Sequence, residues 1–97
     1  MKGKHLGKNN ETFELYKAIL KLKGLDECKR FFRDLCTLEE IIEISKRWQA
    51  VRLLAQDKSY LEIAKKTGLS TTTVARVAYW LYSGTGGYKL MLRRIKN

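Results

Sequence analysis

The chain has 97 residues, and its 20 Lys and Arg against 10 Asp and Glu give a formal net charge of +10. This length suits one small domain, and so positive a protein attracts polyanions, of which nucleic acid is the commonest inside cells. No apolar stretch approaches the roughly 18 residues of a membrane span and no signal peptide is recognisable, so we expect a cytoplasmic protein without a membrane partner.

The N-terminal segment, residues 1–10, carries Lys2, Lys4 and Lys8 with no acidic residue and no apolar periodicity. Such a composition predicts a flexible basic arm. Its contribution to polyanion binding would be non-specific and weakened by salt. Residues 11–97 are expected to form a single helical domain.

Two short helices are expected after the arm. Apolar residues at helical spacing predict the first from Glu11 to about Lys23, and Gly24 would end it. Asp26 is expected to cap the second helix, which extends to about Leu35 with apolar residues on one stripe and basic residues on the other.

A long helix is predicted from Thr37 to about Asp57. The segment Thr37-Leu-Glu-Glu40 has the pattern of a capping box, and no Gly or Pro interrupts the residues that follow. The apolar positions of this helix span a wide arc, so both sides must be covered, either by the rest of the chain or by a second copy. We therefore expect it at the centre of a homodimer interface, with Trp48 as a core or dimer contact.

Cysteine and histidine usage argues against a disulfide framework and against a metal site. Cys28 and Cys36 are expected to be buried free thiols, and the single histidine, His5, lies in the arm. The sequence contains no recognisable nucleophile with its base, no paired catalytic carboxylates and no phosphate-binding loop. We therefore expect no metal ion and no enzymatic activity.

Residues 60–82 have the pattern of two helices joined by a tight turn. Ser59 is expected to cap a short helix, and Ser70 to cap a second one that ends near Tyr82. A final helix with a basic outer face should follow the glycine-containing segment 83–87.

Small and apolar residues within this region favour a DNA-binding helix-turn-helix. Ala64 would allow the helices to cross closely, Gly68 would allow a left-handed turn, and Val74 and Val77 would anchor the second helix. The remaining face of that helix would then be free to enter a major groove. An ordinary helical hairpin with a glycine cap is the alternative.

The side chains expected on that free face suit sequence-specific DNA binding. Hydroxyl groups reach phosphates or base edges, and an arginine pairs with guanine. Ser59, Tyr60 and Lys65 are expected at phosphates, and Tyr79 at the border of the groove. Ser70 lies on the side of the helix that would enter the groove, and the residues expected to read bases are Thr71, Thr72, Ala75 and Arg76. The alternative function is a non-catalytic helical module that binds RNA or a protein and has only non-specific affinity for polyanions.

Three segments, residues 34–40, 47–54 and 67–76, resemble the Trp repressor-like family, and most of all its YerC/YecD-type branch. The resemblance extends from about Glu11 to Ile95. It implies an all-α fold of about six helices, an intertwined homodimer, and a transcriptional regulator, expected to be a repressor, that binds palindromic operators in double-stranded DNA. Two-fold symmetry would then place two half-sites about one helical turn apart, ~34 Å.

The resemblance also implies a pocket for a small-molecule effector, whose residues would be Thr37, Arg47, Thr73 and Arg76. In the Trp repressor, the two matching arginines sandwich the indole of tryptophan. Here Val77 follows the second arginine in place of a small residue, and Trp80 replaces a serine, so both side chains should partly fill the cleft. We therefore expect no cofactor and disfavour L-tryptophan. Another effector remains open, and an ion-pair role for Arg47 is the alternative.

Overall fold

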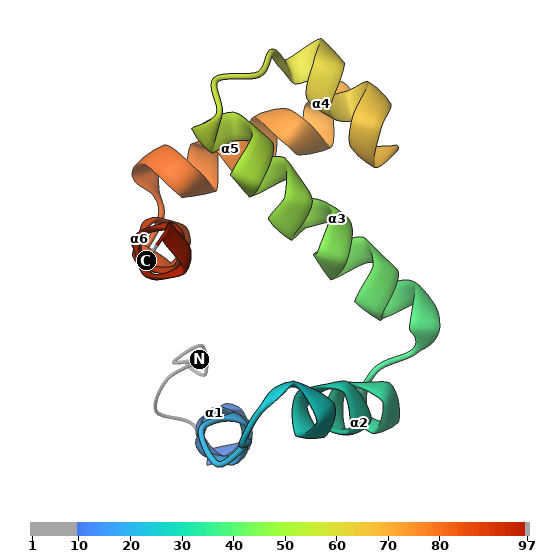
Figure 1. Cartoon of the computed structure of the whole chain (residues 1–97), viewed down its shortest axis with the longest axis vertical. Helices are drawn as coiled ribbons and strands as arrows, with labels where there is room; N and C mark the ends of the chain where they lie inside the picture. The colour runs from blue at the N-terminus through green and yellow to red at the C-terminus, as the bar shows by residue number, and fades with distance from the viewer. Residues whose placement is uncertain (1–9, 97) are drawn as a thin grey trace. The chain divides into compact units, whose positions relative to one another are not determined.

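The structure is a computed structural model that describes residues 10–96 and contains no strand within them (Figure 1). Its helices are α1 (Asn10–Ile19), α2 (Leu25–Leu35), α3 (Leu38–Ala55), α4 (Tyr60–Thr67), α5 (Thr71–Ser83) and α6 (Gly87–Lys96). The predicted all-α class with about six helices is therefore confirmed for this part of the chain.

The predicted arm falls almost entirely outside the described residues. This applies to Lys2, Lys4 and Lys8, and also to His5. Asn10, which was expected in the arm, instead begins α1. Helical structure thus starts one residue earlier than the sequence pattern indicates.

The chain divides into two compact units, residues 1–38 and residues 39–97, which are described separately. In the first unit α1 ends at Ile19, short of the expected Lys23. Two backbone N–H groups that follow it donate to carbonyls three residues earlier, at 3.0 and 3.1 Å. This spacing is that of a tighter helical turn, so α1 ends although the apolar periodicity continues.

The start of α2 differs from the prediction that Asp26 caps it. Gly24 occupies the cap position with φ 92° and offers no side-chain acceptor. Asp26 lies inside the first turn and accepts a 2.9 Å hydrogen bond from Arg30 Nε. Glu27 accepts a 2.8 Å hydrogen bond from the backbone N–H of Lys23. The positive φ of the glycine sets the start of the helix instead of an aspartate cap.

No residue of α1 or α2 is buried. Leu20 and Leu25, between and at the start of these helices, are 82% and 74% exposed. Cys28 and Cys36 are free thiols, as predicted, but the prediction that they are buried is wrong, because both are only half-buried. Two short helices provide too little apolar surface to cover such side chains completely.

The second unit has a core that α3, α4 and α5 build together. Its buried apolar residues are Ala50, Val51, Leu54, Ile63, Leu69, Val74, Val77, Ala78 and Leu81. Trp48 of α3 packs against this core, as do Tyr88 and Leu92 of α6. Trp48 is thus half-buried against the core, in agreement with the first of its two predicted roles, and α6 covers one side of the unit.

The end of α3 leads directly into the predicted helix-turn-helix. The helix runs from Leu38, the residue after the expected cap Thr37, to Ala55, two residues short of the predicted end. Asp57 has φ 63°, and its N–H donates to the Leu54 carbonyl at 2.9 Å, so the chain turns there into α4. Figure 1 shows α4 and α5 together at the C-terminal end of α3, with α6 following at the far end of α5.

None of the described helices is both long and apolar enough to cross a membrane. Within residues 10–96, no three side chains of His, Cys, Asp or Glu are grouped so that they could hold a metal ion.

Candidate nucleic-acid interface

Ser59 caps α4, as predicted. Its backbone is extended (φ −74°, ψ 157°), and its Oγ accepts a hydrogen bond from the backbone N–H of Glu62 at 3.1 Å. This satisfies one of the amides that have no partner within the first turn of a helix. Ser59 and Tyr60, both expected at phosphates, therefore lie at the exposed N-terminal end of an eight-residue helix, and Tyr60 is 45% exposed.

The turn between α4 and α5 depends on Gly68, which has φ 82° and ψ 0°. Its N–H donates to the Ala64 carbonyl at 2.9 Å, which makes it the left-handed C-cap that the sequence predicts. Thr67 is buried, and its hydroxyl donates to the Ile63 carbonyl at 2.8 Å and accepts from the Leu69 N–H at 3.1 Å. One side chain thus joins both sides of the turn, a role for Thr67 that the sequence pattern does not reveal.

Ser70 caps α5 and is also bonded to the residue three positions later. Its Oγ accepts from the backbone N–H of Thr73 at 3.1 Å and donates to Thr73 Oγ1 at 3.0 Å. Thr71 and Thr72 lie between them, are exposed, and make no hydrogen bond through their hydroxyls within the described chain. The first turn of α5 therefore holds two engaged and two available hydroxyl groups.

The two faces of α5 differ sharply in burial. The buried residues are Val74, Val77, Ala78 and Leu81. The opposite face exposes Thr72, Arg76 and Tyr79, at helical spacings of four and three, and Tyr79 is 64% exposed. Ala75 beside them is exposed as well. The residues expected to read bases are therefore solvent-facing, while the rest of the helix anchors them to the core.

The surface of the helix-turn-helix and α6 is strongly basic. Glu62 is the only acidic residue after Asp57 in the sequence, and it lies 3.9 Å from Lys66, one helical turn away. Lys65, next to this exposed and therefore weak ion pair, is exposed too. The basic residues of the same stretch are Lys58, Lys65, Lys66, Arg76, Lys89, Arg93, Arg94 and Lys96. Such an excess favours a polyanionic partner.

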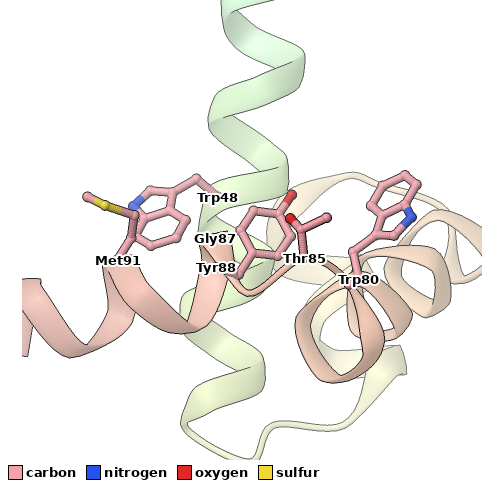
Figure 2. A pocket seen from close by; sticks show the side chains of 7 residues that line it. Trp48, Trp80, Thr85, Gly87, Tyr88 and Met91 are labelled. Carbon is pink, nitrogen blue, oxygen red and sulfur yellow. The ribbon is translucent and has the colours of Figure 1, made fainter. Parts of the chain in front are cut away.

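An aromatic cavity of about 510 Å³ lies beside the C-terminal half of α5. Figure 2 shows Trp48 of α3, Trp80 of α5, and Tyr88 and Met91 of α6 around it. The rings of Trp48 and Tyr88 have their centroids 6.3 Å apart. The remaining lining residues, including Thr85, lie at the α5–α6 connection. The cavity is largely apolar, because aromatic side chains and Met91 provide most of its lining.

Comparison with known proteins identifies the family. A family model described as Trp repressor protein matches residues 10–96. The chain belongs to the Trp repressor family. It is 40% identical over 89 residues to the uncharacterised protein YerC of Bacillus subtilis (strain 168), and the aligned region covers 92% of this chain and 86% of YerC. The predicted resemblance to YerC-type proteins is thus confirmed.

Two solved structures of this family have the same fold. A TrpR-like protein from Eubacterium eligens ATCC 27750 has a TM-score of 0.88 and 41% identity, covering 93% of each chain. A candidate Trp repressor from Staphylococcus aureus has a TM-score of 0.82 and 39% identity, covering 87% of this chain and 84% of the other. The fold of this Trp repressor family member is therefore shared by relatives of moderate identity.

The four residues that were expected to line an effector pocket do not share one environment in this structure. Arg47 is half-buried, and its buried Nε has no hydrogen-bond partner within residues 10–96. Thr73 is bonded to Ser70, Arg76 is exposed, and Thr37 is an exposed residue of the first unit. None of the four expected residues lines the aromatic cavity.

Val77 and Trp80, the two residues that depart from the family pattern, differ from each other in burial. Val77 is fully buried in the core, whereas Trp80 is 42% exposed and lines the aromatic cavity. The larger side chain at position 77 therefore contributes to the packing of α5. The indole at position 80 adds an aromatic wall where the resemblance expects a serine hydroxyl.

Proposed function

We propose that this chain is a sequence-specific DNA-binding transcriptional regulator that acts as a homodimer and represses by occluding polymerase. The observation that carries the proposal is the division of α5 into a face buried in the core and a face that exposes Thr72, Arg76 and Tyr79. A helix held in this way can enter a major groove without loss of packing. The basic, nearly acid-free surface around it supports the same partner.

Each part of the helix-turn-helix has a separate task in this proposal. Ser59, Tyr60 and Lys65 of the α4 region contact phosphates and set the register on the duplex. Arg76 pairs with a guanine edge, while Thr72 and Ala75 contact neighbouring bases, for which a thymine methyl is a suitable partner. The Thr71 hydroxyl contacts a base edge as well, whereas the Tyr79 hydroxyl and the amides at the α5 N-terminus near Ser70 add contacts at the borders of the groove.

A second copy of the chain is the proposed partner of the first unit. No residue of α1 or α2 is buried, and Phe13, Leu20 and Leu25 are about half or more exposed. Apolar surface of this extent is typical of a chain that is completed by association. A two-fold dimer would present two copies of α5 to half-sites ~34 Å apart on a palindromic operator.

We propose that DNA binding requires no cofactor. Trp80 and the buried Val77 differ from the residues of the tryptophan-binding pattern at these positions, and the exposed Arg76 is available to contact DNA. The proposal therefore predicts equal operator affinity with and without L-tryptophan.

The deciding experiment is selection of bound fragments from a random duplex pool at about 50 and 200 mM salt, each with and without L-tryptophan. A protein that neutralises six to ten phosphates loses about 10³ to 10⁵ in affinity over this range. Enrichment of a palindrome that persists at the higher salt supports the regulator. Uniform binding that disappears with salt contradicts it and favours an RNA-binding or protein-interaction module. Enrichment only in the presence of L-tryptophan contradicts the cofactor-free part alone.

A further inference from the structure

Lys46 of α3 lies directly against the turn of the helix-turn-helix. A Cβ atom built on Gly68 would lie 3.5 Å from Lys46 Nζ and 3.9 Å from Lys46 Cε. The lysine is half-buried, although long charged side chains usually reach into solvent. Within residues 10–96 its ammonium makes no hydrogen bond and no ion pair with a carboxylate. Its position therefore needs an explanation other than a salt bridge.

Gly68, and with it Lys46, lies at the C-terminal end of α4, a feature with negative character. Gly68 is the C-cap of this helix, and the last carbonyls of an α-helix have no donor within it. Aligned peptide dipoles give this end a partial negative charge, which a nearby cation stabilises. Since α4 has only eight residues, it is too short to be stable on its own, and contacts from α3 matter for its geometry.

We infer that Lys46 is a positioning residue for DNA reading, which holds the α4–α5 turn in place through the C-terminal end of α4. This inference rests on the proposed DNA-binding function. Gly68 lies only three residues before Thr71, the first residue of α5, so a displaced turn moves the reading helix directly. Lys46 acts through Gly68 and makes no contact with DNA itself.

The competing explanation is that Lys46 is a phosphate contact, and salt dependence separates the two. Removal of one phosphate contact makes the slope of log affinity against log salt concentration shallower by about 0.9. Removal of a positioning residue lowers the affinity for the operator and leaves that slope unchanged. It also lowers discrimination against random duplex, because random sequence does not depend on exact placement of α5.

The test compares Lys46→Met with Lys46→Arg in the full chain. Methionine keeps an unbranched side chain and removes the charge, whereas arginine keeps the charge. Lys29→Met, at an exposed position of α2, is the matched control for loss of one positive charge. Two quantities are measured for each variant: hydrogen exchange of the Gly68 and Leu69 amides, and affinity for the selected operator and for random duplex at several salt concentrations.

The expected result for Lys46→Met is exchange at both amides that is about two- to fivefold faster, as expected for loss of one favourable helix-end charge. Operator affinity should fall by about the same factor with an unchanged salt slope. Lys46→Arg should restore both properties, and Lys29→Met should change neither.

Three results would overturn the inference. They are unchanged exchange at the turn in Lys46→Met, a shallower salt slope, and failure of Lys46→Arg to restore either property. If the unmodified chain selects no operator, the proposed function fails. Amide exchange then decides alone whether Lys46 holds the turn.

Discussion

The two units of this chain differ in how their helices are covered. In the second unit, α3, α4 and α5 bury residues against one another, and Ile63, Val74 and Val77 are completely inaccessible. In the first unit, α1 and α2 bury nothing, and Leu20 remains 82% exposed. A helix whose apolar face has no cover gains little stability from its sequence alone.

The difference shows which part of the chain is packed without a partner. The helix-turn-helix packs against α3 in a shared core, has a serine cap on each of its two helices, and exposes the face of α5 that carries Thr72, Arg76 and Tyr79. The first unit leaves the apolar residues of two short helices without complete cover. In our proposal the second unit reads DNA and the first unit determines how two copies are joined.

The largest effect is expected from breaking the core of the second unit. Ile63 is 0% exposed, so Ile63→Ala removes buried atoms and leaves a cavity. We expect a loss of about 2–5 kcal/mol in the free energy of unfolding, measured by urea denaturation. Leu61 on the same helix is 61% exposed, and Leu61→Ala should stay within about 0.5 kcal/mol. Equal losses for the two variants would contradict the division of α4 into a core face and a solvent face.

The next effect concerns the reading face. Arg76→Ala should lower operator affinity by about 1–3 kcal/mol and relax specificity at one base position, if the arginine pairs with guanine. Lys65→Ala is the comparison, and it should weaken binding to all sequences and reduce the salt slope by about 0.9. The measurement is a titration against operators mutated at each position. A uniform loss for Arg76→Ala would assign that residue to a phosphate.

A smaller effect is expected in the first unit. Leu25→Lys places a charge on a 74% exposed apolar position, which is harmless in a monomer and unfavourable where a second copy covers it. We expect the dimer dissociation constant to rise about five- to thirtyfold, as for a loss of ~1–2 kcal/mol at an interface. Sedimentation equilibrium measures this constant, and Lys29→Ala is the exposed control. A chain that sediments as a monomer before any substitution would refute the role given to the first unit.

The sequence predicts best those features that depend on neighbours along the chain. The serine caps at positions 59 and 70 and the glycine turn at position 68 were expected from local rules, and all three are observed. The predictions of where α1 ends and of which residue caps α2 were wrong. Apolar spacing alone did not reveal the tighter hydrogen bonds after Ile19, and a glycine at position 24 already starts the second helix.

Contacts between distant segments could not be predicted in the same way. Nothing in the sequence indicates that Lys46 lies at the turn that follows it by more than twenty residues, or that Trp48, Trp80 and Tyr88 line one cavity. Partial burial of Cys28 was missed because a cysteine on an apolar stripe is expected inside, whereas the first unit offers no complete cover. These features depend on how helices pack, which periodicity does not encode.

The smallest effect concerns the helix caps, which also differ between the two units. Ser70 caps α5 through its side chain, whereas Gly24 at the start of α2 cannot. Ser70→Ala should cost about 1 kcal/mol of unfolding free energy. Ser83→Ala, at the exposed end of the same helix, should change it by less than about 0.5 kcal/mol. Because Ser70 Oγ also bonds Thr73, operator affinity should fall together with stability. Lower affinity without any loss of stability would instead show that the Ser70 hydroxyl contacts DNA directly.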